Sequence, residues 1–344
     1  MYVPDAVFGA FPHLVVSFGA RWDNPGTNGG RALRYAHGQA GPDKSVPMRT
    51  LAIAQSKGGS GKTTIALTLL AAAAEAGQRA LLVDADHHAA GSTVLVGFVP
   101  PERSLYAALR DNVHPLQLAQ KVPGLNCLVL PGSYALSDLP SDLPLNALAE
   151  CIHALAYERP EAEGESFSPD LVIIDCPGGD VAMTRMALYA ADRVAIPMNF
   201  SALDLTANET TINLLAEVRL LRGGMPVLAG IIPNRVQRED SVARDLAFLV
   251  ASRIPLLPTI PESNLIRRTG AAADPAKRVV VNSHPNSGAA GQFRLLYRVL
   301  TGKQPWARED GLRNLAEQLR TSVEHLAAER DEHEPAPALQ GSPA

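Results

Sequence analysis

Cysteine and aromatic residues are both scarce in this sequence of 344 residues. The three cysteines, Cys127, Cys151 and Cys176, form no CxxC pair, and their wide spacing excludes the disulfide framework of small secreted proteins. Aromatic residues make up only 5% of the chain, which argues against a carbohydrate-binding or base-stacking surface. No apolar run reaches the roughly 18 residues of a membrane-spanning helix, and no basic leader precedes the first apolar residues. We therefore expect a soluble, cytoplasmic protein.

The chain also lacks a large excess of charge of either sign. Its 31 lysines and arginines and 35 aspartates and glutamates give a formal net charge of −4, which excludes a uniformly basic nucleic-acid binder. Apolar residues amount to 46%, which is enough to bury a full core and excludes global disorder. The charge is unevenly distributed, because residues 201–320 hold 16 basic and 11 acidic residues. A local basic face is therefore compatible with the composition.

Short apolar runs alternate with helical patterns from Met48 onward. The expected strands span residues 50–55, 80–84, 126–130, 171–175, 193–197, 227–232 and 256–260, and the expected helices include residues 64–76, 182–191 and 210–222. Several of the runs are apolar at successive positions, as in parallel strands that are covered on both faces. We therefore predict an α/β fold, a doubly wound and mostly parallel sheet with helices on both faces.

The two ends of the chain differ in composition from its centre. Residues 1–47 contain glycine and proline without a helical or strand period, so we expect either a disordered extension or a functional start at Met48. Regular patterning covers residues 48–305. A C-terminal amphipathic helix is expected within residues 306–330, and the acidic, proline-rich residues 331–344 are expected to be disordered.

A glycine-rich segment lies between the first expected strand and the first expected helix. Its glycines would allow successive backbone N–H groups to converge on phosphate oxygens, and the helix N-terminus would add the positive end of its dipole. Lys62 is placed to reach the β- and γ-phosphates of a nucleotide, and the Thr63 hydroxyl to bind Mg²⁺. The residues expected to bind the nucleotide are Lys57, Gly58, Gly59, Ser60, Gly61, Lys62, Thr63 and Thr64.

This loop departs from the common phosphate-loop pattern at its start. Ser56 stands in the position of the first glycine, and Lys57 follows it. In this the sequence resembles the deviant Walker A motif of the ParA/MinD family of P-loop ATPases, and the resemblance extends to about residue 305. It implies that Lys57 reaches the nucleotide of a second subunit, much as an arginine finger acts in trans. ATP with Mg²⁺ would then hold a homodimer together, and residues 48–305 would form the ATPase domain.

Two further motifs resemble those of the same family. One expected strand ends in Asp-Ala-Asp at residues 84–86, and another ends at Asp175, before a loop that contains proline and glycine. The resemblance implies that Asp86 positions the attacking water, that Asp84 helps to hold the Mg²⁺ shell and that Asp175 holds a Mg²⁺-bound water. The implied catalytic residues are Lys57, Lys62 and Asp86, and the implied metal-binding residues are Thr63, Asp84 and Asp175.

The sequence departs from the family's pattern directly after Asp86, where His87 and His88 replace the usual Pro-Gln. We interpret them as two exposed loop histidines, because no third metal ligand is evident from the sequence, and a metal site is the alternative. Cys176 has no evident histidine partner, so we interpret it as a small buried residue and not as a nucleophile.

Two later segments resemble the positions at which the family contacts the nucleotide base. Asn234 begins an Asn-Arg pair after an expected strand, and Pro261 lies in residues 258–266, which resemble the loop that packs on the adenine. The resemblance implies that both residues contact the base. Ordinary turn chemistry is the alternative for each.

The basic segment bears on the biological role. ParA-type proteins bind DNA without sequence preference as ATP-bound dimers, and pooling two basic patches would add phosphate contacts. Solvated helix charges are the alternative for each basic residue. The residues expected to contribute to such a DNA-binding face are Arg267, Arg268, Lys277, Arg278, Arg294 and Arg298.

We therefore expect a slow, partner-stimulated ATPase that segregates plasmid or chromosomal DNA with a ParB-like partner and associates with the nucleoid. The alternatives are MinD-like positioning on a membrane, positioning of a transfer complex or protein compartment, a metabolic P-loop enzyme, and a nucleotide-binding module without turnover. Stable membrane association is disfavoured, because the expected helix at residues 312–326 has mixed charge and an acidic tail follows it.

Overall fold

The computed structural model describes residues 48–157, 167–199, 202–236, 254–307, 309–315 and 317–318. The segments 1–47 and 331–344, for which disorder was expected, lie outside the described residues. So does the end of the expected C-terminal helix.

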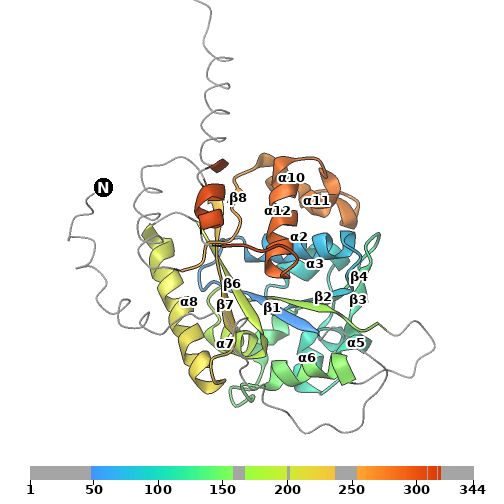
Figure 1. The fold of residues 1–344 in the computed structure, drawn as a ribbon. Helices are drawn as coiled ribbons and strands as arrows, with labels where there is room; N and C mark the ends of the chain where they lie inside the picture. The colour runs from blue at the N-terminus through green and yellow to red at the C-terminus, as the bar shows by residue number, and fades with distance from the viewer. Residues whose placement is uncertain are drawn as a thin grey trace, which may run out of the picture.

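The described strands form one eight-stranded sheet in the order β3-β4-β2-β5-β1-β6-β7-β8 (Figure 1). The strands are β1 Arg49–Ile53, β2 Ala80–Asp84, β3 Gln120–Lys121, β4 Cys127–Leu130, β5 Leu171–Asp175, β6 Arg193–Met198, β7 Val227–Val236 and β8 Ile260–Pro261. The β3–β4 pair is antiparallel, and the other pairs are parallel. Strands β2 and β5 are buried along their whole length. The predicted doubly wound, mostly parallel sheet is confirmed.

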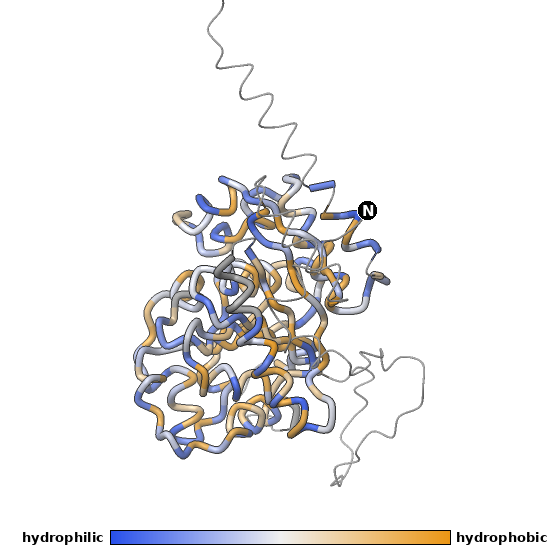
Figure 2. Tube along the Cα trace, turned by 90° about the vertical axis from the view of Figure 1, so that its left-hand side faces the viewer, coloured by the Kyte–Doolittle hydropathy of each residue, from blue (hydrophilic) through white to orange (hydrophobic). Residues whose placement is uncertain are grey.

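Helices cover both faces of this sheet. The α-helices are α2 Lys62–Glu75, α3 Ala90–Val96, α4 Leu105–Arg110, α5 Pro115–Leu118, α6 Ala147–Tyr157, α7 Val181–Ala190, α8 Ala202–Leu221, α10 Asn264–Thr269, α11 Val280–Ser283 and α12 Gly288–Leu300. Leu51 and Ile53 of β1 belong to the core layer under α2 and α12, whereas Ala52 and Ala54 belong to the layer under α6 and α7. Alternate side chains of one strand therefore serve two cores, as the pleat requires. The helices in Figure 2 accordingly carry both apolar and polar positions.

Most observed elements begin or end within two residues of the expected ones. Helix α2 begins at Lys62, so it includes the last residues of the glycine-rich loop, and Gly77 follows it in the left-handed conformation with φ of 71°. Strand β7 runs on to Val236. The helix expected at residues 210–222 is longer and begins at Ala202.

The prediction of a strand at residues 256–260 is wrong. Leu256 makes an isolated bridge with Ile231, and a short strand, β8, forms only at Ile260–Pro261. The physical reason is the presence of Pro255 and Pro258, whose nitrogens cannot donate to a strand ladder.

The segment that follows α12 packs back onto residues 256–259. Residues 309–315 and 317–318 are helical, and Leu315 is fully buried. The side-chain oxygen of Asn314 accepts a hydrogen bond from the Thr259 backbone N–H at 2.8 Å, and the Trp306 indole donates to the Leu256 carbonyl at 2.8 Å. Within the ranges that the structure describes, no helix has both the length and the apolar character needed to cross a membrane.

Candidate functional site

The glycine-rich loop joins the end of β1 to the start of α2, at the carboxyl edge of the sheet. Gly59 and Gly61 adopt left-handed conformations with φ of 76° and 92°. A Cβ at Gly61 would also collide with the side-chain amide nitrogen of Asn234, so this position accepts only glycine without rearrangement. The Asn234 amide donates a hydrogen bond to the Ser60 carbonyl at 2.7 Å, which fixes the loop to the end of β7.

The N-terminus of α2, which follows the loop, has the features of an anion-binding site. Gly61 is its N-cap, no side chain caps it, and its first turn has no acidic residue. The backbone N–H groups at this end are therefore available for phosphate oxygens. The position agrees with the one expected from the sequence.

Lys62 lies inside the loop and is only 6% exposed. Its ammonium group donates a hydrogen bond to the Lys57 carbonyl at 3.0 Å. Burial lowers the pKa of Lys62, and the negative charges of Asp175 and Asp86 partly oppose that shift. A Cβ at Gly178 would lie 3.3 Å from the Lys62 ammonium, so the glycine after β5 leaves room for this side chain.

Two of the three aspartates are fully buried. Asp84 and Asp175 end the neighbouring strands β2 and β5 and are partners in their register. One carboxylate oxygen of Asp84 accepts hydrogen bonds from the backbone N–H and the hydroxyl of Ser92, both at 2.7 Å. The other accepts the Asp86 N–H at 3.2 Å. Burial nevertheless raises the pKa of Asp84 to about 6.

Asp175 differs from Asp84 in its partners. Neither of its buried carboxylate oxygens has a partner in hydrogen-bonding geometry within the described part of the chain. Burial and the adjacent Asp84 carboxylate raise the pKa of Asp175 well above its ordinary value, and the nearby Thr63 hydroxyl and Lys62 ammonium offset only part of this. A buried carboxylate that is compensated only in part is costly, so a cation beside it would be strongly favoured.

The expected metal-binding residues meet around Gly91, at the start of α3. A Cβ at Gly91 would lie 3.0 Å from an oxygen of Asp175, 3.2 Å from the Thr63 methyl carbon and 3.3 Å from an oxygen of Asp84. Carboxylate and hydroxyl oxygens are the ligands that Mg²⁺ prefers. The unpartnered oxygens of Asp175 and this donor set fit a Mg²⁺ ion held by Asp175 and Thr63, with Asp84 beside it.

Asp86 lies at the exposed border of the same group, with its side chain 17% exposed. One of its carboxylate oxygens accepts the His88 N–H at 3.0 Å and lies 3.0 Å from His88 Nδ1. The negative charge of Asp86 is close enough to Lys62 to favour the charged form of the Lys62 ammonium group. The role that the resemblance implies for Asp86, positioning the attacking water, stays a prediction.

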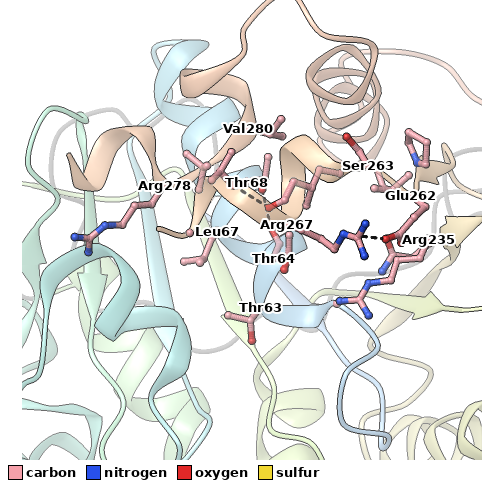
Figure 3. Close-up of a pocket in the computed structure, with 18 of the residues that line it drawn as sticks. Thr63, Thr64, Leu67, Thr68, Arg235, Glu262, Ser263, Arg267, Arg278 and Val280 are labelled. Atoms are coloured by element: carbon pink, nitrogen blue, oxygen red, sulfur yellow. Dashed lines mark hydrogen bonds and ion pairs between the residues drawn. The ribbon is translucent and has the colours of Figure 1, made fainter. Parts of the chain in front are cut away.

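A cavity of about 380 Å³ opens beside the N-terminal half of α2 (Figure 3). Its walls come from the loop and α2, from the end of β7, and from residues 260–270 and 278–280. Asn234 and Pro261, the two expected base contacts, both line it. Arg267 and Glu262 approach each other to 3.5 Å at this wall, as the dashed line in Figure 3 shows. The cavity therefore continues the phosphate loop toward the place expected for a base.

The six residues expected to bind DNA do not form one group. Arg267 and Arg278 line the cavity. Arg278 also donates to the backbone carbonyls of Ala272 and Val94 at 2.7 and 2.6 Å. Arg294 is held by the Glu75 carboxylate at 2.7 and 2.8 Å.

The remaining three are exposed. Arg298 donates to the Gln304 side chain at 3.0 Å. Arg268 on α10 and Lys277 are exposed and have no side-chain hydrogen bond or ion pair with another described residue. These two are the best placed of the six to meet an external phosphate.

Several residues that build the site were missed in the sequence. Ser92 holds Asp84, and its hydroxyl accepts the Gly132 N–H at 3.2 Å. Thr211 of α8 accepts the Ser56 N–H at 2.9 Å and donates to the buried Gln55 side chain at 3.0 Å. A small Gly-Ser pair seven and eight residues after Asp84 was a visible signal. For Thr211, which is 155 residues from Ser56, the sequence gave no signal.

Comparisons with known proteins agree with this geometry. The family described as AAA domain matches residues 48–223, about half of the chain. The chain is 32% identical over 207 residues to the chromosome partitioning protein ParA of Caulobacter vibrioides, covering 58% of this chain and 74% of that protein.

Solved structures show the same fold. An ATP complex of a McdA variant from Cyanothece superposes with a TM-score of 0.64 at 22% identity, covering 76% of this chain and 100% of that one. The cell division ATPase MinD of Pyrococcus furiosus superposes with a TM-score of 0.58 at 26% identity, covering 74% and 99%. With the deviant loop, the strand-end aspartates and these matches, the chain belongs to the ParA/MinD family of P-loop ATPases.

Proposed function

We propose that this chain is a ParA-type positioning ATPase. It binds ATP with Mg²⁺, dimerises and then binds double-stranded DNA without sequence preference, and a ParB-like partner stimulates its slow hydrolysis. The supporting observation is the meeting of buried Lys62 with the Asp84–Asp175 pair at a glycine loop, because such a site suits a triphosphate and a divalent cation. The similar proteins described above, a chromosome partitioning ParA and a McdA–ATP complex, support the same proposal.

Each residue of the site has a role in this proposal. The loop N–H groups and the start of α2 bind the phosphates, and Lys62 binds the terminal ones. Bound Mg²⁺ would neutralise charge on the phosphate oxygens. Thr63 and Asp175 hold that ion, and Asp84, fixed by Ser92, lies against it. Asn234 supports the loop and, with Pro261, borders the base cavity.

The chemical step and the dimer depend on the remaining two residues. Asp86 lies at the exposed border of the site, where it positions a water for attack on the terminal phosphate. Lys57 is half-buried at the start of the loop, and its own carbonyl holds Lys62. Its side chain serves the nucleotide of a second copy, so nucleotide and dimer form together.

DNA binding by the full chain tests the proposal. We expect a fluorescent random duplex to be bound with a slowly hydrolysed ATP analogue and Mg²⁺, to be released with ADP, and to be bound less tightly as salt rises. Lys57→Ala should abolish both dimerisation and DNA binding. Lys121→Ala, which removes an exposed lysine of β3, is the matched control and should retain both.

Two results count against the proposal. Binding to DNA that is equal with ATP analogue, ADP and no nucleotide would separate DNA binding from the nucleotide site. Retention on anionic vesicles in place of DNA would favour the MinD-like alternative.

A further inference from the structure

Asp86, His87 and His88 form a compact cluster at the end of β2. One ligand atom of each lies within 4.8 Å of those of the other two. The shared Asp86 oxygen is 3.0 Å from His88 Nδ1 and 3.8 Å from His87 Nδ1. The two imidazole rings lie 4.1 Å apart between centroids at an angle of 39°. The cluster thus offers one carboxylate and two imidazoles to the same small volume.

The two oxygen–nitrogen separations are close to those of ligands around one transition-metal ion. Zn²⁺ binds imidazole nitrogen and carboxylate oxygen at about 2.0–2.2 Å, so adjacent ligands of a tetrahedral ion lie about 3.4 Å apart. The two oxygen–nitrogen distances in the cluster fall on either side of that value. Two imidazoles also favour Zn²⁺ and similar ions over Mg²⁺, which prefers oxygen ligands.

The environment of His87 gives a second, independent reason to expect a metal ion at this cluster. Its Nδ1 is buried and has no hydrogen-bond partner in the described part of the chain, although the side chain as a whole is 31% exposed. A buried ring nitrogen without a partner loses the hydrogen bond it would make with water. A metal ion between this nitrogen and the Asp86 oxygen would satisfy it.

We propose that Asp86, His87 and His88 form a binding site for a divalent transition-metal ion of the Zn²⁺ class. The site is separate from the proposed Mg²⁺ position, because it uses Asp86, whereas that position uses Asp175 and Thr63. The two sites are linked through the Asp86 N–H, which donates to Asp84 at 3.2 Å. With three protein ligands, the ion keeps a coordination position open to water.

The site also has a consequence that rests on the proposed function. Asp86 cannot hold a metal ion and position the attacking water with the same carboxylate. Occupancy of the site therefore slows hydrolysis without displacing the nucleotide. A transition metal would extend the lifetime of the nucleotide-bound form.

Direct metal binding tests the site without reference to hydrolysis. The probe is Co²⁺, added to metal-free, untagged full chain and followed by its visible absorption, with Zn²⁺ as competitor. We expect one strong site per chain, displaced by Zn²⁺ and not by excess Mg²⁺. His88→Ala and the double variant His87→Ala/His88→Ala should weaken it by about tenfold or more. His88→Ala is expected to fold because His88 is 71% exposed, and far-UV circular dichroism checks the fold of the double variant, which also removes the 31% exposed His87. His153→Ala, which removes an exposed histidine of α6, is the matched control and should bind as the wild type does.

The outcomes separate the site from the proposed function. Equal Co²⁺ binding by the wild type and the double variant, or displacement of Co²⁺ by Mg²⁺, would overturn the site. Where the site is present, Zn²⁺ should slow ATP hydrolysis by the wild type and leave nucleotide affinity within about twofold. Zn²⁺ binding that leaves hydrolysis unchanged would overturn the regulatory consequence and the role proposed for Asp86, and the metal site would stand.

Discussion

Asp84 and Asp175 are register partners on the adjacent parallel strands β2 and β5, and both carboxylates are fully buried. Ser92 and the Asp86 N–H donate to Asp84, whereas neither oxygen of Asp175 has a partner in hydrogen-bonding geometry among the described residues. Among those residues, only the nearby Thr63 hydroxyl and Lys62 ammonium favour the charge of Asp175. Two buried carboxylates side by side destabilise the fold unless a proton or a cation joins them. Electrostatic destabilisation of this kind, between two buried carboxylates, is typical of a functional site.

This relationship predicts that Asp175→Asn stabilises the nucleotide-free protein while abolishing Mg²⁺-dependent hydrolysis. The folded pKa of Asp175 is raised, so the folded state holds a proton that the unfolded state releases, and stability falls as pH rises above the ordinary aspartate pKa. The gain from Asp175→Asn should therefore be about 1–3 kcal/mol near pH 8 and should vanish near pH 4. Urea unfolding at both pH values measures it.

The control for this prediction is Asp142→Asn, which removes an exposed carboxylate. Its effect should be small at both pH values. A loss of stability at pH 8 in Asp175→Asn would show that the Asp175 charge is stabilised by groups other than a bound cation.

Gly91→Ala should impair the metal position selectively. The added methyl group would lie 3.0 Å from Asp175 and 3.3 Å from Asp84, in the space that the donors share. We expect Mg²⁺-dependent hydrolysis to fall by about tenfold or more, with nucleotide affinity in EDTA little changed. Isothermal titration in Mg²⁺ and in EDTA separates the two effects.

Gly288→Ala is the matched control for Gly91→Ala. Gly288 also lies in the first turn of a helix, α12, and a Cβ there meets nothing within 4 Å. Hydrolysis by this variant should equal that of the wild type. Equal activity of Gly91→Ala and Gly288→Ala would place the metal ion elsewhere.

Asn234→Ala should weaken nucleotide binding through the loop. It removes the 2.7 Å hydrogen bond to the Ser60 carbonyl and one of the side chains that line the cavity. The loss of a buried hydrogen bond costs about 1–3 kcal/mol, which corresponds to a roughly 5- to 150-fold weaker affinity. Fluorescent nucleotide titration measures it. Asn146→Ala, which removes a half-buried side chain that donates to Glu150 and does not line the cavity, should leave the affinity unchanged, and unchanged affinity in Asn234→Ala as well would contradict the role of Asn234.

Local patterns predicted the central sheet and the loop because their signals are local. Strands β2 and β5 are apolar runs that end in aspartate, and the observed bounds equal the expected ones. Two glycines of the loop, Gly59 and Gly61, adopt left-handed conformations, which favour glycine, so the glycine-rich composition of the loop indicates them. By contrast, the strand expected at residues 256–260 was wrong, because its apolar run predicts a strand while Pro255 and Pro258 remove ladder donors.

Long-range contacts set the limit of prediction. Thr211 reaches Ser56 across the fold, and Arg294 meets Glu75, which is 219 residues away. No local pattern indicates either contact. The net charge of residues 201–320 follows from the sequence, but the sequence does not distinguish an arginine held by a carboxylate from one that is exposed.

That distinction yields a prediction about DNA binding. Arg268 and Lys277 are exposed, whereas the Arg294 guanidinium is engaged by Glu75 and by the Val281 carbonyl at 3.4 Å. Arg268→Ala/Lys277→Ala should therefore weaken ATP-dependent DNA binding and lower the salt dependence of log K by about one for each phosphate contact removed.

Arg294→Ala is the matched comparison, because it removes the same kind of charge from a side chain that is already paired. It should cost about 1 kcal/mol of stability through the partly exposed pair with Glu75, and it should leave the salt dependence of DNA binding nearly unchanged. Fluorescence anisotropy across a salt series, with urea unfolding alongside, measures both quantities. If Arg294→Ala lowers the salt slope and Arg268→Ala/Lys277→Ala does not, DNA approaches the α12 side, and the Glu75–Arg294 pair opens when it binds.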